Sequence, residues 1–398
     1  MKVRTRVTAR TAGTRPLALL LALLLVVTAC STGSDGGPAD DGLAAGSGAG
    51  QAGADDPVGG VEAPDEDWVV EVAFSNDTKL GGCAVGELDP GSPGGEIVTV
   101  AGDGQVWLTA RVDGAWSSSS IAQLPGEAIG CVAADLLPEI PGDEIVTVGV
   151  TAGGEESGSP GVAHLLSRGA DGWTTEVLLE DDALLHGVAV GDMDKDGVLD
   201  VVVAGYTRRV TVLGRDPSDS GWRTLGTGML PDAAKSVVVL DPLGDRAGLA
   251  VVGCRDGSLI EFRLAEGGEL ARVDWAPGSS SQARLGALSP GVLVASDGGT
   301  LTFVKGDTRG PEFYASGDKL RGAMVADVDP GVGASRQACT AGYDGAIVVT
   351  GITSGESRVV ARDDDRLHHL AVGQLHPEGP PSLVACGYSG RVIVVTHR

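Results

Sequence analysis

Apolar and polar positions alternate in blocks along this chain, and the pattern of blocks recurs about every fifty residues. Each copy begins with a short apolar run, passes through a polar loop into a second apolar run, and then turns into a third. Seven first runs align, at 82–88, 130–136, 187–193, 236–242, 282–288, 322–328 and 369–375. Short apolar runs separated by polar or glycine-bearing turns are typical of β-strands.

The turns between second and third runs favour antiparallel pairing. Four of them contain an Asp-Gly pair, at Asp103-Gly104, Asp256-Gly257, Asp297-Gly298 and Asp344-Gly345. Glycine supplies the positive φ that a tight hairpin needs. A fourth, more polar run closes most copies, with Trp116, Trp173 or Trp222 near its start in three of them. Four short antiparallel strands in a period of about 40–50 residues predict one blade of a β-propeller.

The two ends of the pattern complement each other. The last copy stops after its third run, at 391–397, whereas a strand-like run at 68–74 precedes the first copy and belongs to none. We expect the N-terminal run to form the outer strand of the last blade, which closes the ring without a covalent bond and leaves no open edge. The predicted fold is therefore all-β, a seven-bladed β-propeller over 67–398, with six or eight blades as alternatives.

The N-terminus predicts export and anchoring. Residues 1–29 combine five basic residues with a short apolar stretch, as signal peptides do. Val27-Thr28-Ala29-Cys30 resembles a bacterial lipobox, which implies cleavage before Cys30 and lipidation of its thiol; the alternative is an ordinary secretory signal with a chance cysteine. Residues 30–66 are rich in Gly, Ala, Ser and Asp, which predicts a disordered acidic tether. We expect a protein lipid-anchored on the extracytoplasmic side of a bacterial envelope membrane, the outer membrane in a Gram-negative cell.

Charge and cysteine content narrow the possible partners. The chain carries a net charge of −25; the five bases of the signal and the eight acids of 31–66 leave −22 for the ring. Nucleic acid and anionic lipid surfaces would be repelled at long range, so neither is an expected ligand. Cys83, Cys131, Cys254, Cys339 and Cys386 are expected to be small buried apolar residues of a monomeric ring.

The third copy contains a pattern suited to a metal ion. The candidate ligands are Asp192, Asp194, Asp196, the carbonyl of Val198, and Asp200, with Gly197 at the sharp turn. Calcium prefers six to eight hard oxygens, and this spacing wraps carboxylates around one point. We predict one structural Ca²⁺ in the third blade; the alternative is a solvated Asp-rich turn that binds nothing.

The context of this loop carries a family resemblance. Its first half resembles an EF-hand loop, but strands flank it and the twelfth position is Val203. The arrangement instead resembles the FG-GAP repeats of integrin α-subunit propellers and bacterial VCBS-type repeats, whose first hairpin holds a nine-residue calcium loop. The resemblance covers 68–398 as a pattern and 192–200 as a motif. The first two copies keep some carboxylates and could hold a second ion, the sixth keeps Asp327 and Asp329, and copies four, five and seven have lost the loop.

A second candidate site is predicted on the opposite face. Alignment of the first strands puts His186, Lys235, Arg321 and His368 at one entry position, against Gly81, Ile129 and Ser281 in the other copies. Tyr206, Tyr343 and Tyr388 share the position after the second run in three of the same blades. Tyrosine with basic groups predicts a site for a sugar, a carboxylate or an acidic peptide. The alternative is that the tyrosines pack between blades and the bases pair with local acids.

Enzymatic motifs are few. The sequence has no Gly-x-Ser-x-Gly, no phosphate loop and no His-Glu-x-x-His. The leading hypothesis is a non-catalytic binding module for a protein or glycan partner, stabilised by calcium. One alternative is a propeller enzyme acting on an acidic polysaccharide or lactone through His186, Arg321 and His368. Another is an envelope assembly lipoprotein resembling the outer-membrane barrel-insertion propeller, although that family's Asp-x-x-Thr-Gly ending of the third strand is missing here.

Overall fold

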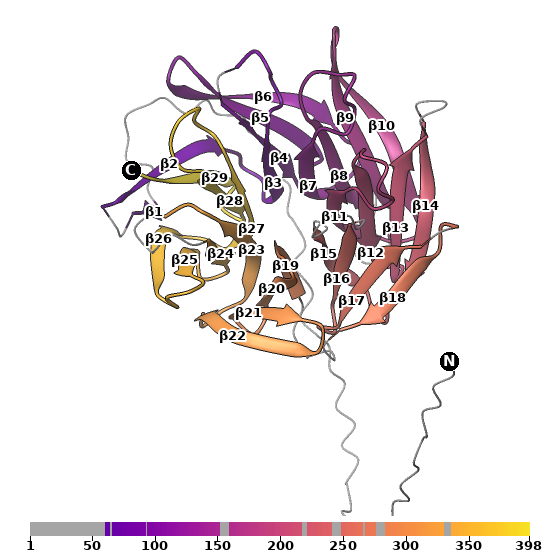
Figure 1. The fold of residues 1–398 in the computed structure, drawn as a ribbon. Helices are drawn as coiled ribbons and strands as arrows, with labels where there is room; N and C mark the ends of the chain where they lie inside the picture. The colour runs from indigo at the N-terminus through magenta and orange to yellow at the C-terminus, as the bar shows by residue number, and fades with distance from the viewer. Residues whose placement is uncertain are drawn as a thin grey trace, which may run out of the picture. The chain divides into compact units, whose positions relative to one another are not determined.

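The computed structural model describes residues 60–63, 66–92, 94–151, 159–216, 221–240, 248–265, 267–275, 283–329 and 336–398. Within these residues all helix or strand structure is β, and it forms seven antiparallel sheets arranged in a ring around an axis (Figure 1). The expected seven-bladed β-propeller is confirmed, and the six- and eight-bladed alternatives are wrong. The signal segment, Cys30 and residues 31–59 of the expected tether lie outside the described residues.

Each blade is formed by strands consecutive in sequence, except where the ring closes. Blade one contains β3 (Leu80–Gly86), β4 (Glu96–Ala101), β5 (Gln105–Val112) and β6 (Ala115–Gln123). Blade two contains β7 (Ala128–Ala134), β8 (Glu144–Val150), β9 (Gly161–Gly169) and β10 (Gly172–Asp181). Blade three contains β11 (Leu185–Gly191), β12 (Asp200–Gly205), β13 (Arg209–Arg215) and β14 (Trp222–Met229). Blade four contains β15 (Ala234–Leu240), β16 (Leu249–Cys254), β17 (Leu259–Leu264) and β18 (Leu270–Asp274). Blade five contains β19 (Ala283–Leu288), β20 (Gly291–Ser296), β21 (Thr300–Lys305) and β22 (Thr308–Ala315).

The last two blades also take strands from the N-terminal segment. Blade six contains β23 (Leu320–Ala326), β24 (Gln337–Gly342), β25 (Ala346–Gly351), β26 (Ser357–Asp363) and β1 (Val61–Glu62); blade seven contains β27 (Leu367–Gly373), β28 (Ser382–Gly387), β29 (Arg391–His397) and β2 (Trp68–Ser75). The first strand of every blade is innermost, next to the first strands of its neighbours (Figure 1).

Burial follows the position of each strand within its blade. The second strands β4, β8, β12, β24 and β28 are buried along their whole length, because each blade packs against a neighbour on both faces. Fourth strands such as β6 and β10 are largely exposed or half-buried. The innermost strands need small residues: a Cβ on Gly82 would lie 3.0 Å from the Cα of Gly130 in the next blade. Glycine there permits the close approach of two backbones. The five cysteines of the ring are buried free thiols, as expected.

The Asp-Gly turns behave as predicted in three blades. Gly104, Gly257 and Gly345 have φ of 82°, 84° and 74°. In the fifth blade the left-handed residue is Gly299, with φ of 82°, and not the expected Gly298. Two adjacent glycines satisfy the same turn chemistry, so the sequence alone did not distinguish them.

A β-bulge on the innermost strand marks the entry position in six blades. The residue left out of the ladder is in turn Gly81, Ile129, His186, Lys235, Arg321 and His368, which are the aligned residues of six copies. A bulge bends the strand and redirects a side chain. The described part of blade five has no such bulge: β19 pairs continuously from Ala283 to Leu288.

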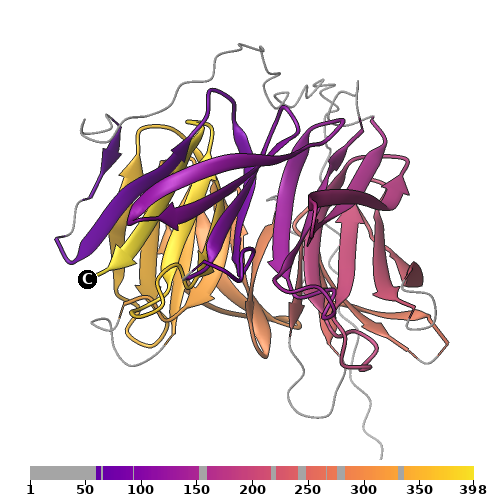
Figure 2. The same cartoon turned by 90° about the horizontal axis from the view of Figure 1, so that it is seen from above.

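Strand β2 closes the ring as expected. It pairs antiparallel with β29 and forms the outer strand of blade seven, beside the C-terminal strands drawn in yellow (Figure 2). Trp68 at its start is 2% exposed and meets the edge of the His397 ring at a centroid distance of 5.1 Å. The amide of Arg398 donates to the carbonyl of Asp67 at 2.9 Å. The two ends of the propeller therefore hold each other.

A second attachment was not predicted. Strand β1 lies within the segment expected to be tether, yet it pairs with the outer edge of β26 in blade six. The amide of Asp364 extends this pairing by donating to the carbonyl of Gly60 at 2.7 Å. The N-terminal segment thus joins two neighbouring blades. Among the described residues, no helix is long and apolar enough to span a membrane.

Trp68→Ala should lower the free energy of unfolding by about 3–5 kcal/mol, because it removes a buried aromatic side chain from the closing strand. Val69→Ala is the matched control, since Val69 is the next residue of the same strand and is 38% exposed. Urea denaturation of both variants measures the difference. Equal losses in the two variants would contradict the role given to Trp68.

Candidate functional site

The antiparallel strands give the ring two faces. Loops between first and second strands open on one face, which we call the lower face. Connections into first strands and turns between second and third strands open on the other, the upper face. The acidic loop of blade three is on the lower face, at the opposite end of β11 from His186.

The structure brings three of the five expected metal ligands together. Carboxylate oxygens of Asp192, Asp194 and Asp200 lie within 4.8 Å of one another. Asp196 is not in this group, and its Oδ1 accepts a hydrogen bond from the amide of Val198 at 2.8 Å. In the described part of the chain, this is the one set of three metal-ligating side chains so gathered.

The backbone of the loop curls around Asp192. Its carboxylate accepts hydrogen bonds from the amides of Lys195 at 2.6 Å, Asp196 at 3.2 Å and Gly197 at 3.1 Å. The curl requires positive φ at Lys195 and Gly197, 68° and 88°. Glycine adopts that conformation without strain, which explains the glycine in the sixth position.

The electrostatics of the loop favour a bound cation. Burial, with the nearby charges of Asp194 and Asp196, raises the pKa of Asp200 to about 7, although the amide of Met193 donates to it at 2.7 Å. Burial and the charge of Asp196 also raise the pKa of Asp194. A divalent cation would relieve this repulsion, and an all-oxygen donor set suits calcium better than softer metals.

Other blades use the equivalent position to hold their own loops. Glu96 accepts hydrogen bonds from two loop amides, at 2.9 Å each, and Glu144 does the same at 3.0 and 2.8 Å. In blade six the neutral Gln337 takes this place, accepting from Val328 at 2.8 Å and donating to the carbonyl of Asp329 at 2.9 Å. The first residue of the second strand therefore ties its loop together in all four blades, including Asp200 in blade three.

Three further carboxylates of the eroded loops are engaged in protein contacts. Asp89 pairs with Arg168 at 2.6 Å, and Asp143 accepts from the amide of Glu87 at 2.9 Å. Asp329 is fully buried and lies 3.5 Å from His397 Nε2. These contacts favour a single metal site, in blade three.

On the upper face, the basic residues predicted from alignment come together around the axis. His186 lies within electrostatic range of Lys235 and His368, and His368 within range of Arg321. A fifth member was missed: Arg284 of β19 interacts with His186, Arg321 and His368. We call His186, Lys235, Arg284, Arg321 and His368 the axial cluster.

Ser281 is aligned as the fifth entry residue. Ser281 itself lies outside the described residues, and β19 begins only at Ala283. Because β19 lacks the bulge of the other first strands, Arg284 pairs with Ala295 within the ladder and still reaches the cluster. Alignment of the first strands at the entry position therefore did not reveal Arg284.

Each predicted tyrosine is held beside the entry of its own blade by a backbone hydrogen bond. The amides of Tyr206, Tyr343 and Tyr388 donate to the carbonyls of Leu184, Lys319 and Arg366, at 2.8, 2.8 and 2.9 Å. The turn after the second strand is thus tied to the connection that enters the first strand. In blade five the residue at the tyrosine position is Asp297.

The tyrosines form two groups. The ring of Tyr206 stacks on His186 at a centroid distance of 6.0 Å, and its hydroxyl bonds to Lys235. The hydroxyls of Tyr343 and Tyr388 lie 3.1 Å apart. The structure therefore does not bring all three tyrosines together, although it places each beside an entry residue.

Cations cover the second group. Arg366 lies 4.0 Å and Lys79 4.5 Å from the ring centroid of Tyr388; Arg321 lies 4.8 Å and Lys319 5.7 Å from that of Tyr343. We call Tyr343, Tyr388, Lys79, Lys319 and Arg366 the tyrosine pair and its cations. Lys79, Lys319 and Arg366 were not predicted, although each lies two residues before the entry residue of its blade, which is Gly81, Arg321 or His368.

Burial and like charges perturb the axial cluster. Burial, with the charges of Lys235 and Arg284, lowers the pKa of His186 well below its usual range. Burial, with Lys79 and Arg284, does the same to His368. The pKa of Arg284 falls to about 10, chiefly through burial and then through Arg321. Arg321 pairs with Asp297, so part of the charge is balanced, as the packing alternative foresaw.

A separate groove was not predicted. It lies on the upper face where blades two and three meet, and its lining residues are Thr151, Pro160, Glu180, Asp181, Asp182 and Arg209. Asp181 accepts a hydrogen bond from Thr207 at 2.7 Å and lies 3.6 Å from Arg209. Its acidic lining distinguishes it from the axial cluster.

Comparison with known proteins supports the β-propeller fold but identifies no family. No protein-family model matches this chain, and no curated protein matches it. Among solved structures, the WD40 β-propeller domain of Doa1 is similar with a TM-score of 0.62 and 9% identity, over 83% of this chain and 97% of that one. BBS1N, in its complex with ARL6DN, is similar with a TM-score of 0.60 and 13% identity, over the same shares of 83% and 97%. At these identities the likeness establishes a β-propeller fold only.

Added calcium should raise the melting temperature by several degrees over that in EDTA, because an ion that binds only the folded state stabilises it by about 2.7 kcal/mol at 100 times its Kd. Asp192→Asn with Asp194→Asn should abolish the increase, whereas Glu144→Gln in blade two should retain it. Differential scanning calorimetry measures all three proteins. A melting temperature that calcium does not change in the wild type would contradict a metal site.

Glu144→Gln should itself stabilise the protein in a pH-dependent manner. Burial raises the pKa of Glu144 to about 7, so the folded chain binds more protons than the unfolded chain from about pH 4 to pH 7, and stability falls as pH rises through that window. Glutamine, which fills the same place at Gln337, has no charge to bury. The gain in unfolding free energy should grow across the window and reach the order of 2 kcal/mol at pH 8. Urea denaturation from pH 4 to pH 8 measures it, and a gain independent of pH would disprove the explanation.

Proposed function

We propose that this chain is an extracytoplasmic β-propeller lipoprotein of the FG-GAP/VCBS type that binds a protein or glycan partner without catalysing a reaction. The observation that carries the proposal is the gathering of basic and aromatic side chains from several blades at one end of the axis. Residues of different blades there contact one another, as Tyr343 of blade six and Tyr388 of blade seven do. Rigid strands position these groups, which is what a recognition surface requires.

Anchoring and calcium complete the proposal. Val27-Thr28-Ala29-Cys30 and the basic segment before it support lipid attachment at Cys30 to a bacterial envelope membrane. The acidic segment that follows would hold a monomeric ring away from the bilayer. The oxygens of Asp192, Asp194 and Asp200 support one Ca²⁺ on the lower face, where it would stabilise blade three and leave the upper face to the partner.

Use of the ring as a binding scaffold agrees with one of its structural neighbours, since BBS1N was solved in complex with ARL6DN. The axial histidines support binding better than catalysis. Both have pKa values lowered by burial and by surrounding cations, and the tyrosine and arginine groups beside them are engaged with each other.

A photo-crosslinking residue at two positions of blade seven tests which face binds. Asp365 is exposed just before β27 on the upper face, and Glu378 is exposed just after β27 on the lower face. We expect p-benzoylphenylalanine at 365, and not at 378, to form adducts in intact cells, and mass spectrometry to identify them as protein or glycan.

Two results would contradict the proposal: adducts from position 378 alone, or none from either position in a folded, membrane-associated protein. Cys30→Ala serves as the control for location. It should move the chain from the membrane fraction to the soluble fraction, and an unchanged membrane fraction would contradict the lipid anchor.

A further inference from the structure

The upper face concentrates positive charge in a protein that is otherwise strongly acidic. Residues 67–398 carry a net charge of −22, yet Lys79, Lys319, Arg321 and Arg366 all lie within 6 Å of a ring centroid of the tyrosine pair. Arg284 is close enough to interact with Tyr343 and Arg321. Like charges held close together on a partly buried surface repel each other, and an anion placed among them removes that cost.

The two axial histidines make few polar contacts within the protein. The Nδ1 atom of His368 lies 3.2 Å from the carbonyl oxygen of Gly81, and its ring lies edge-to-face with that of Tyr388 at a centroid distance of 6.0 Å. The Nδ1 atom of His186 is buried and has no hydrogen-bond partner among the described residues. A buried polar atom without a partner is uncommon in a folded protein and invites a ligand or ordered water.

The geometry of the tyrosines separates two classes of ligand. Sugars bind proteins by stacking on exposed aromatic faces, but Arg366 and Lys79 lie over the ring of Tyr388, and Arg321 over that of Tyr343. The two hydroxyl groups bond to each other. What this surface offers to a ligand is therefore charge and N–H donors, which suit carboxylates.

The origin of the cations in three blades suits a ligand with several carboxylates. Lys79, Lys319 and Arg366 precede the first strands of blades one, six and seven, and each is half-buried with its charged end near the tyrosine pair. Long polyanions such as nucleic acid would meet the repulsion of the acidic ring around this patch. A short acidic segment can reach the patch without covering the ring.

We propose that the tyrosine pair and its cations bind an acidic peptide segment of a partner protein, whose carboxylates contact Lys79, Lys319 and Arg366. This inference rests on the proposed function and narrows the partner from protein or glycan to a protein with exposed, consecutive acidic residues. Arg321 is buried and paired with Asp297, so it holds Tyr343 in position and is not a primary contact; Arg366, whose side chain is 40% exposed, has among the described residues only the exposed Asp365 at 3.8 Å as an acidic partner.

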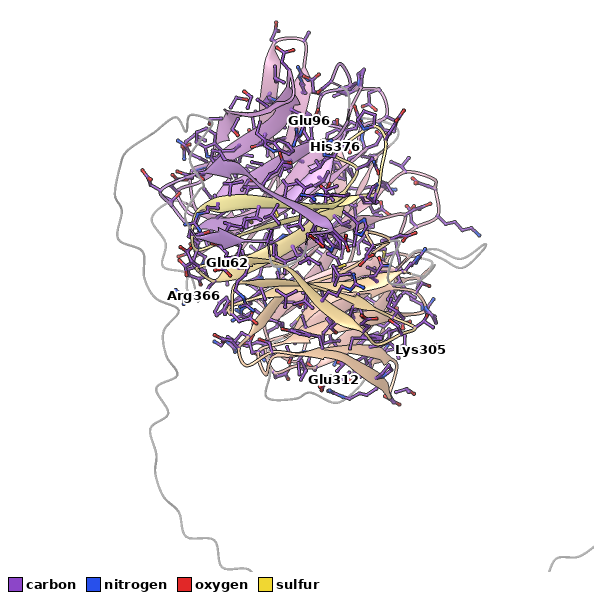
Figure 3. The ribbon with its side chains drawn as sticks, turned by 90° about the vertical axis from the view of Figure 1, so that its left-hand side faces the viewer. Glu62, Glu96, Lys305, Glu312, Arg366 and His376 are labelled. Carbon is purple, nitrogen blue, oxygen red and sulfur yellow. The ribbon has the colours of Figure 1, made fainter. Side chains whose placement is uncertain are left out.

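Binding of fluorescein-labelled hexaglutamate, followed by fluorescence anisotropy at low salt, tests the inference. The wild-type protein should bind it and should not bind hexaglutamine. Lys319→Gln with Arg366→Gln should weaken binding by about tenfold or more, since charge-assisted contacts exceed neutral ones in strength. The matched control is Lys305→Gln with Arg309→Gln, which removes the same charge from the β21–β22 hairpin and should leave the affinity unchanged. Figure 3 shows Lys305 on the opposite face of the ring from Arg366.

A second measurement distinguishes binding at the tyrosine pair and its cations from attraction by the overall charge of the protein. An anion among these cations should raise the pKa of His368, measured by NMR titration of its ring protons, in the wild type and in the control variant. The Lys319→Gln/Arg366→Gln variant should show no such rise, and melting temperatures should confirm that all variants are folded.

The possible failures have different meanings. Equal weakening by both double variants would show attraction by overall charge alone and would overturn the site. Binding of oligogalacturonate in preference to hexaglutamate would overturn the peptide and favour the glycan. If position 365 forms adducts with a protein in cells but hexaglutamate does not bind, the acidic class is wrong while the proposed function stands.

Discussion

The pairing of β2 with β29 is the interaction on which the rest of the structure depends. It is a non-covalent link between the two ends of the ring, made by a strand ladder, by the burial of Trp68 and by the bond from Arg398 to Asp67. The candidate binding surface lies across the junction that this link closes. Lys79 of blade one covers Tyr388 of blade seven, and His368 of blade seven approaches the carbonyl of Gly81 in blade one. Opening the ring would separate the groups that make the site.

The candidate sites on the two faces carry opposite charge for different structural reasons. On the lower face, the first residue of a second strand ties the preceding loop, and in blade three the loop brings three carboxylates together. On the upper face, a bulge on the first strand of six blades redirects one side chain, and four of those side chains are basic or imidazole groups near the axis. Strand β11 has His186 near its start, at the upper face, and leads into Asp192 at the lower face.

The fold and part of the candidate site could be predicted from the sequence because the same short pattern of strands and turns recurs in every blade. Seven aligned apolar runs determine the number of blades, and the spare run at 68–74 determines the closure. The entry residues were found by alignment because their bulges recur at the same place. Arg284 was missed because β19 has no bulge and Arg284 lies within the ladder, three residues after Ser281, which the alignment put at the entry position. Lys79, Lys319 and Arg366 do share one repeat position, two residues before the entry residues Gly81, Arg321 and His368, but only the packing of blades one, six and seven against each other brings them to the tyrosines. Strand β1 is too short, at two residues, to leave a periodic pattern.

The central claim is that the two faces have separate roles, stabilisation below and recognition above. The most direct test is the affinity for hexaglutamate measured with saturating calcium and again with EDTA, at a temperature well below both melting transitions. Sites at opposite ends of the strands with no shared contacts should act independently, so the two affinities should agree within about twofold. Loss of hexaglutamate binding on removal of calcium from the still-folded protein would contradict the account.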